Sequence, residues 1–143
     1  MKDNKGQRKS GLKNPRFRFA YFSPKYEETL SFYRDGLELT IIEAWDRTPD
    51  DRGTLFEAAS GIIEVLALPR SGESDHLWDA RTPQGAFMVI ELENVESLYR
   101  LALAKGLPIQ EALKAHPWGH RAFCLREPNG LTIFFFSEVE NGQ

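Results

Sequence analysis

The sequence lacks several features that would each point to a particular class of protein. Cys124 is the only cysteine among 143 residues, so the chain cannot form an internal disulfide, which is typical of a reducing compartment. No apolar run approaches the ~18 residues that a membrane span needs. No apolar stretch follows the N-terminal lysines, as it would in a secretory signal. We therefore expect a cytoplasmic protein with no membrane partner.

Clustered glycines and a basic surface are also missing. The glycines are scattered at turns, so there is no phosphate-binding loop, and no nucleophile elbow is visible. Residues 1–18 carry seven basic residues and one acidic residue, whereas the remainder carries 11 basic and 20 acidic residues. An acidic folded part argues against a nucleic-acid partner. We predict that residues 1–14 form a disordered basic tail.

The remaining composition is that of an ordinary globular protein, with 41% hydrophobic and 27% charged residues. Aromatic residues alternate over residues 17–21, which predicts a strand. Ser23 and Pro24 can begin a helix, and Gly36 can end it in the left-handed conformation. Further strands are predicted at residues 39–46, 53–58 and 62–68.

The same order of elements then returns. After a linker over residues 69–84, the pattern predicts a strand at 86–92 and a helix that Asn94 caps and Gly106 ends. Strands follow at 108–113, 120–126 and 131–137, and the two helix-ending glycines are 70 residues apart. We predict one α+β domain over residues 15–138, made of two βαβββ modules at 15–68 and 85–138.

Two segments carry a family resemblance. Residues 29–37 read TLSFYRDGL. The last predicted hairpin contains Pro117-Trp118-Gly119-His120-Arg121, followed by Glu127-Pro128-Asn129-Gly130. In paired βαβββ modules, these segments resemble the vicinal oxygen chelate superfamily, which includes glyoxalase, bleomycin resistance proteins and extradiol dioxygenases. The resemblance implies a curved mixed sheet around a cup, with the helices on the outer face, and it favours a homodimer. It does not choose one activity, because members include lyases, dioxygenases and non-catalytic binders.

The resemblance also implies four metal-ligand positions inside the cup. In this sequence they fall at Phe17 or Arg18, Glu64, Phe87 and Phe134. Only Glu64 is a side chain of the ligand type, and a divalent cation needs several oxygen, nitrogen or sulfur donors. We therefore expect no metal and no other cofactor.

Two histidines form a separate candidate pair. His116 and His120 are four residues apart, but Pro117 and Gly119 lie between them, so this stretch is not the helix of a zinc motif. His120 begins a predicted strand. Three interpretations stay open for it: an exposed loop histidine, a side chain that contacts a ligand or transfers a proton, or a metal ligand.

Strand alternation then predicts the lining of the cup. The predicted ligand-binding residues are Phe17, Trp45, Arg52, Phe87, Trp118, His120 and Phe134. A carboxylate among aromatic rings needs a partner or loses its charge. Either Arg18, Arg52 or Arg121 therefore pairs with Glu64, or the cup is wet and admits a ligand. Among the arginines we expect Arg52 or Arg121, because each begins or adjoins a strand beside the cup.

The predicted lining favours a small-molecule binding protein for an aromatic or cationic organic ligand. Three alternatives remain at this point. One is a metal-dependent lyase or dioxygenase, which requires bound metal. Another is a metal-free enzyme with Glu64 as the catalytic base, which requires turnover that is lost when Glu64 is changed. The last is a structural subunit whose cup is filled by its own side chains.

Overall fold

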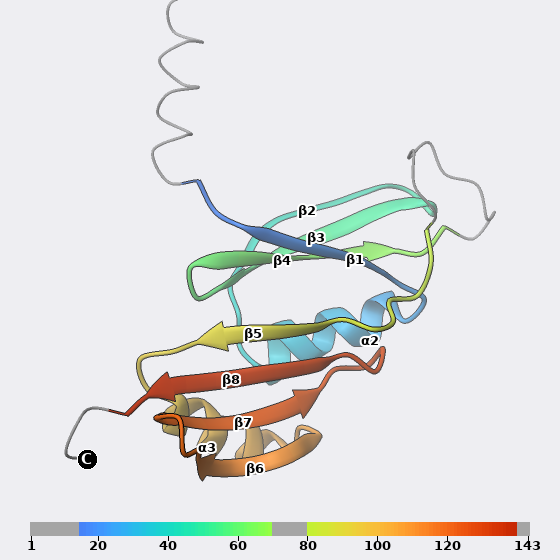
Figure 1. The fold of residues 1–143 in the computed structure, drawn as a ribbon. Coiled ribbons are helices and arrows are strands. Elements are labelled where there is room, and N and C mark those ends of the chain that lie inside the picture. The colour runs from blue at the N-terminus through green and yellow to red at the C-terminus, as the bar shows by residue number, and fades with distance from the viewer. Residues whose placement is uncertain (1–14, 70–79, 140–143) are drawn as a thin grey trace, which may run out of the picture.

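The computed structural model describes residues 15–69 and 80–139. The predicted basic tail at residues 1–14 and most of the predicted linker therefore lie outside the described residues. Within the described parts, the chain forms two successive groups of elements with the same order (Figure 1).

The first module begins with strand β1 (Arg18–Ser23), helix α2 (Tyr26–Ser31) and one π-helical turn, η1 (Phe32–Gly36). It continues with strands β2 (Ile41–Thr48), β3 (Asp51–Ala58) and β4 (Gly61–Ala67). The second module consists of β5 (Phe87–Glu91), α3 (Val95–Lys105), β6 (Ile109–Ala115), β7 (His120–Arg126) and β8 (Thr132–Glu138). The predicted α+β architecture of two βαβββ modules is confirmed.

Each module has its own four-stranded mixed sheet, with strand orders β1-β4-β3-β2 and β5-β8-β7-β6. The first and last strands of each module pair in parallel, and the other neighbours pair antiparallel. Arg18 lies opposite Ile62, and Phe87 lies opposite Thr132 in the corresponding place. The sequence repeat is therefore also a repeat of strand register.

The first helix differs from the prediction at both ends. Ser23 is the last residue of β1, and its hydroxyl accepts a hydrogen bond from the Lys25 backbone N–H, while the helix begins at Tyr26. Gly36 is not left-handed; Glu38 has the positive φ of 58° instead. Gly36 lies close to the second module, because a Cβ there would lie 2.9 Å from the end of the Leu107 side chain, which would have to shift.

The second helix follows the prediction closely. The Asn94 side chain accepts a hydrogen bond from the Ser97 N–H at 3.2 Å, which satisfies one of the free donors at the helix start. Gly106 ends the helix with a φ of 68°, in the left-handed region that glycine adopts without steric cost.

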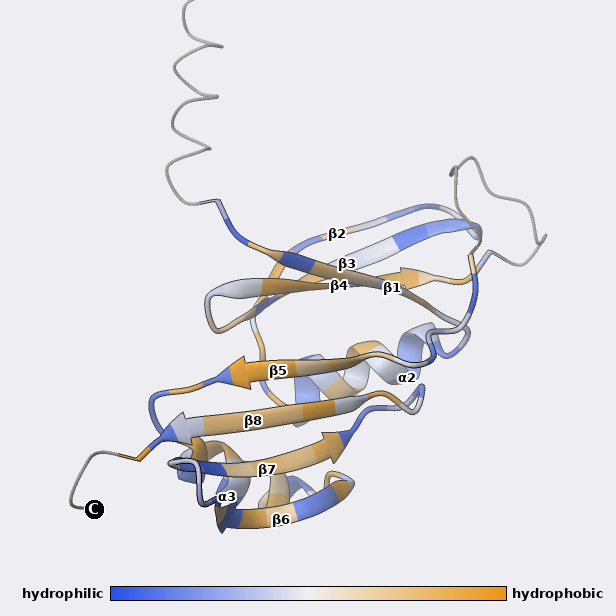
Figure 2. Ribbon diagram, in the orientation of Figure 1, coloured by the Kyte–Doolittle hydropathy of each residue, from blue (hydrophilic) through white to orange (hydrophobic). Residues whose placement is uncertain are grey.

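One continuous core joins the two modules. It holds residues from α2 and β4 of the first module together with residues from α3, β7 and β8 of the second. Each helix therefore covers one face of its own sheet, and both covered faces share this core. Figure 2 shows apolar residues running along β4, β5, β7 and β8. In β8 the apolar residues are consecutive, as Ile133, Phe134, Phe135 and Phe136, so both faces of this strand are apolar.

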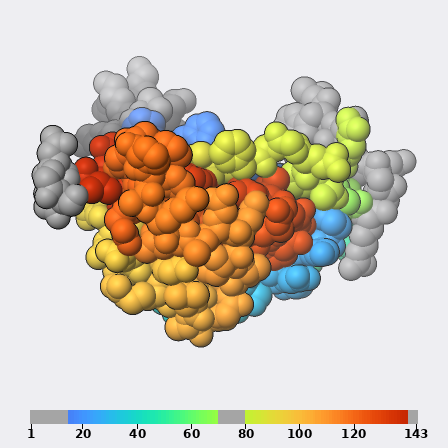
Figure 3. Space-filling view, turned by 60° about the horizontal axis from the view of Figure 1, so that its bottom comes forward, coloured from blue at the N-terminus to red at the C-terminus, as the bar shows by residue number. Residues whose placement is uncertain are grey.

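The two sheets are not closed around one cup. We call the face of each sheet that turns away from the shared core its outer face. This face carries the residues expected to line the cup, and the helices cover the opposite face of each sheet in the described residues. In Figure 1, α2 lies below the first sheet and α3 lies behind the second. Figure 3 shows the second module over most of the face turned towards the viewer, with α2 in blue beside it.

Residues 15–69 and 80–139 contain no helix that is both long and apolar enough to span a membrane.

A buried carboxylate forms hydrogen bonds that connect the second module to the first. Glu127, which is 2% exposed, accepts hydrogen bonds from the Tyr21 hydroxyl at 2.8 Å and from the backbone N–H groups of Asn129 and Leu131 at 2.6 and 2.9 Å. Burial, and then the neighbouring Tyr33 and Glu127, raise the pKa of Tyr21, so its hydroxyl remains a donor. Asn129 extends this network to Ser23 and Thr29.

Removal of this carboxylate should loosen the junction between the modules. We expect Glu127→Ala to lower the free energy of unfolding by about 2–4 kcal/mol, because it leaves several buried donors without an acceptor. Urea unfolding followed by circular dichroism measures the change. Glu28→Ala, at an exposed position of α2, is the control and should change stability by less than about 1 kcal/mol. Equal midpoints for the two variants would contradict this role of Glu127.

Candidate functional site

Strand register decides which side chains lie on the outer face of the first sheet. Ala20, Glu64, Leu55 and Glu43 lie opposite one another across the four strands. Partners in register share a face, so Arg18, two residues from Ala20, lies on the same face as Glu64. Phe17 precedes β1, is 78% exposed and has the opposite parity. Arg18, rather than Phe17, therefore corresponds to Phe87 of the second module.

Glu64 has its ion-pair partner on the same sheet. The Arg18 Nη1 atom lies 3.3 Å from the Glu64 carboxylate, whose side chain is 15% exposed. The expectation that Arg52 or Arg121 pairs with Glu64 is wrong. Both arginines lie on the helix-covered faces, where Arg52 pairs with Glu27 at 2.6 Å and Arg121 pairs with Glu96 at 3.3 Å. Neighbouring side chains along a strand point to opposite faces of the sheet. Arg52 and Arg121 therefore lie on the helix-covered faces, whereas Arg18 and Glu64 lie on the outer face.

Trp45 lies over the outer face of the first sheet. Its indole ring covers Gly53, where a Cβ would be 2.2 Å from the ring, and its Nε1–H donates a hydrogen bond to Asp51 at 3.1 Å. Arg47 lies 5.8 Å from the centre of the ring. The first outer face is therefore partly covered by its own tryptophan.

The second outer face carries a cluster of aromatic rings. We define the aromatic cluster as His116, Trp118, His120, Phe134 and Phe136. The rings of His116 and Trp118 are stacked with centroids 4.3 Å apart, and those of His120 and Phe136 with centroids 4.2 Å apart. Phe134 lies 6.3 Å from His116 and 6.2 Å from Phe136. The rings thus form one connected surface across β7, β8 and the turn before β7.

A hydrogen bond fixes the arrangement of two of these rings. The Trp118 Nε1–H donates to His120 Nδ1 at 3.1 Å. Indole nitrogen is only a donor, so His120 Nδ1 is the acceptor of this hydrogen bond. His120 is therefore part of the aromatic cluster. Its contact with a ligand stays a prediction.

Apolar side chains on β5 extend the aromatic cluster. Phe87 and Val89 lie opposite Thr132 and Phe134, so they share the outer face. They are 63% and 55% exposed, and Trp118 is 62% exposed. Exposed apolar side chains of this kind are typical of surfaces that bind another molecule.

The structure brings together some of the sequence-predicted site residues and separates others. Phe87, Trp118, His120 and Phe134 lie on the second outer face, and Trp45 and Glu64 lie on the first. Arg52 lies on the helix-covered face, under the ring of Tyr26 at 4.6 Å. Sequence reasoning did not assign His116 to the site, although its alternation with Trp118 and His120 was the available signal.

The four metal-ligand positions of the resemblance fall on two separate sheets. Arg18 and Glu64 lie on the first, and Phe87 and Phe134 lie on the second. Three of these side chains offer no metal-binding atom, and the Glu64 carboxylate is engaged by Arg18. The part of the chain that the structure describes has no group of three or more His, Cys, Asp and Glu side chains placed to hold a metal ion. These residues do not fit the divalent metal of the superfamily.

Cys124 lies beneath the second outer face, beside Glu111. Its thiol is 3.8 Å from the Glu111 carboxylate, and the residue is 5% exposed. Burial raises the pKa of Cys124 to about 11, and the Glu111 charge and hydrogen bond add to this shift. Because the thiolate is the reactive form, the thiol should be inert near neutral pH.

Alkylation with iodoacetamide tests this environment. A raised pKa leaves little thiolate at pH 8, so the native protein should react much more slowly than the unfolded protein, and the rate should rise up to about pH 11. Glu111→Gln removes the negative charge and should speed the reaction at pH 8. Mass spectrometry measures the modified fraction, with Glu28→Gln as the control. A faster reaction in the control than in Glu111→Gln would contradict the assignment.

Comparisons with known proteins agree with this geometry. Among solved structures, TioX from Micromonospora sp. ML1 is similar with a TM-score of 0.73 and 15% identity, over 87% of this chain and 99% of that one. A lactoylglutathione lyase from Agrobacterium tumefaciens has a TM-score of 0.66 and 16% identity, over 86% and 92% of the two chains. A search of curated protein sequences gives no match.

A third solved structure is described as a glyoxalase/bleomycin resistance protein/dioxygenase from Alicyclobacillus acidocaldarius. It has a TM-score of 0.64 and 20% identity, over 90% of this chain and 94% of that one. At these identities the similarity shows the fold alone. The family model described as Glyoxalase/Bleomycin resistance protein/Dioxygenase superfamily matches residues 17–135, which is most of the chain. The chain therefore belongs to the glyoxalase/bleomycin resistance protein/dioxygenase superfamily.

Proposed function

We propose that this protein binds a small aromatic organic molecule on the aromatic cluster of the second sheet, without the divalent metal of its superfamily. The observation that carries the proposal is the exposed, ordered ring surface around Trp118, which is 62% exposed yet held by a hydrogen bond to His120. Fixed aromatic rings present large contact area with little loss of side-chain entropy on binding.

Charges around the aromatic cluster support a cationic ligand. Glu91 lies opposite Phe136, and Glu138 lies opposite His120, so two carboxylates flank the rings on the same face. A planar cation would stack on the rings and remain near these carboxylates. The unsuitable side chains at the four metal-ligand positions support binding without a metal-dependent step.

We further infer that two copies of the chain pair to cover their outer faces. In one chain the outer faces turn away from the shared core, and Phe87 and Val89 remain exposed at 63% and 55%. A partner that placed its first sheet against this second sheet would bring Arg18 and Glu64 towards the aromatic cluster. The proposed ligand would then lie between an ion pair and a wall of rings.

Calorimetry with proflavine, a planar aromatic cation, tests the binding proposal. We expect proflavine to bind more tightly than 1-naphthalenesulfonate, a planar aromatic anion. Trp118→Ala and Phe134→Ala should each weaken proflavine binding about tenfold, equivalent to about 1.4 kcal/mol. Phe17→Ala is a matched control, because Phe17 is 78% exposed but lies outside the outer face, and it should leave affinity unchanged.

Two results would overturn this function. One is an equal loss of affinity in Phe17→Ala and Trp118→Ala, which would show non-specific adsorption to exposed rings. The other is stoichiometric zinc, manganese, nickel or iron in the purified protein that disappears in Glu64→Ala. That result would support the alternative function, a metal-dependent lyase or dioxygenase of the superfamily.

Sedimentation velocity tests the pairing. The wild-type protein should sediment as a dimer, and Val89→Glu should shift it towards the monomer by placing a charge in the covered face. Leu103→Glu, at an exposed apolar position of α3 that is 55% exposed, should remain dimeric. A wild-type monomer at all concentrations, or dissociation by Leu103→Glu alone, would contradict this interface.

A further inference from the structure

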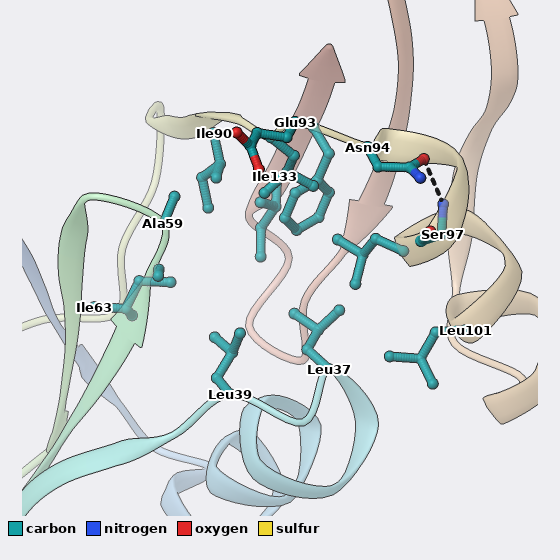
Figure 4. Close-up of a pocket in the computed structure, with 14 residues that line it drawn as sticks. Leu37, Leu39, Ala59, Ile63, Ile90, Glu93, Asn94, Ser97, Leu101 and Ile133 are labelled. Atoms are coloured by element: carbon teal, nitrogen blue, oxygen red, sulfur yellow. Dashed lines mark hydrogen bonds between the residues drawn. The ribbon is translucent and has the colours of Figure 1, made fainter.

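A cavity of about 440 Å³ lies between the two modules, away from both outer faces (Figure 4). Its walls come from the segment between η1 and β2, the turn between β3 and β4, the end of β5, helix α3 and strand β8. Protein interiors leave few voids larger than a water molecule. A cavity of this size is within the range of small-molecule sites.

The walls of the cavity are almost wholly apolar. Leucine and isoleucine side chains from both modules point into it, including Leu37, Leu39, Ile63, Leu101 and Ile133 (Figure 4). Polar side chains occur only at one edge, where Glu93, Asn94 and Ser97 surround the start of α3. An apolar chamber with polar groups confined to its mouth fits a molecule with an apolar body and a single polar head.

The backbone around the cavity is held in an uncommon conformation. Among the described residues, only Glu38 and Ala59 are non-glycine residues with positive φ, at 58° and 51°. Glu38 lies between Leu37 and Leu39, both of which line the cavity, and Ala59 lines it directly. Such conformations are costly for residues with a Cβ and persist where the surroundings require them. Here they turn apolar side chains towards the empty space.

The mouth of the cavity favours a neutral or cationic head. The start of α3 is already satisfied, because Ser137 Oγ accepts the Val95 N–H at 2.8 Å and Asn94 accepts the Ser97 N–H. The backbone N–H groups of Val95 and Ser97 are therefore not free to bind an anion. Glu93 is exposed at the rim and is the only ionisable residue in the lining, so a carboxylate or phosphate head would be repelled.

The space also continues beyond the first cavity. Ala58, Ala59, Ile63 and Ile90 line a neighbouring hollow of about 330 Å³ that reaches Phe87. An extended chain could therefore enter along the edge of β5 and pass between the modules. A flat ring system would not follow this path as easily as a flexible aliphatic chain.

We propose that the space between the modules is a second binding site, for an aliphatic chain that ends in an amine or hydroxyl head. The body would lie among the leucine and isoleucine side chains, and the head would lie at Glu93, Asn94 and Ser97. This site is separate from the aromatic cluster and does not depend on the function proposed for it. A bound chain would contact both modules and stabilise their junction.

Isothermal titration of the full chain with 1-aminodecane, decan-1-ol and decanoate, below their aggregation limits, tests the proposal. The amine and the alcohol should bind once per chain and raise the melting temperature, and decanoate should bind at least tenfold more weakly. Leu101→Trp fills the cavity and should reduce amine affinity at least tenfold. Leu103→Trp is the matched control on the same helix, where residue 103 is exposed and outside the lining.

Two further variants locate the ligand. Glu93→Gln should reduce the preference for the amine over the alcohol about threefold or more, without affecting the alcohol. Trp118→Ala should leave both affinities unchanged. Loss of binding in Trp118→Ala, or equal losses in Leu101→Trp and Leu103→Trp, would overturn the proposal, as would the absence of binding by all three probes.

Because Leu101→Trp could misfold, a second measurement uses the wild-type protein. With methyl-labelled protein, the chain protons of 1-aminodecane should show nuclear Overhauser contacts to the methyl groups of Ile63 and Leu101. Contacts only to the ring protons of Trp118 and Phe134 instead would place the amphiphile on the aromatic cluster and overturn the second site.

Discussion

The relative position of the two modules depends on a buried carboxylate. Glu127 lies in the turn that joins the last two strands, yet one of its oxygens accepts a hydrogen bond from Tyr21 of the first strand, 106 residues earlier. A buried carboxylate is costly unless it is fully hydrogen-bonded. Here the donors come from its own turn and from the other module, so the turn and the junction stabilise each other. This contact lies within the junction of the two modules, beside their shared core, and it helps to fix how they pack.

The two modules have the same backbone but different outer faces. At equivalent register positions, the first sheet has Arg18 and Glu64, and the second has Phe87 and Phe134. The first face thus carries an ion pair and its own covering tryptophan, whereas the second exposes a surface of rings. Duplication of one βαβββ unit supplies the frame, and side-chain differences at a few positions give each sheet a separate chemistry.

The two proposed sites differ in the ligand shape that they favour. The aromatic cluster is an exposed, planar surface held by the hydrogen bond from Trp118 to His120. The cavity between the modules is lined by branched aliphatic side chains and has polar groups only at its mouth. A flat ligand gains most contact on the first, and a flexible chain gains most in the second. A fold with two sheets and one shared core can therefore offer two unlike apolar environments.

The sequence by itself determined the order of elements and the repeat, because helix and strand periodicity, the Asn94 cap and the Gly106 stop are local signals. The family resemblance also placed Glu64 and Phe134 at equivalent positions of the two modules, and it left Phe17 or Arg18 as the equivalent of Phe87. Only the tertiary structure decided that Arg18 pairs with Glu64 and that Arg52 and Arg121 lie on the opposite faces. Side-chain parity reverses with each residue along a strand, so an uncertainty of one residue exchanges the two faces. The cavity and the separation of the outer faces were also beyond the sequence, since both arise from how two modules pack through Tyr21 and Glu127.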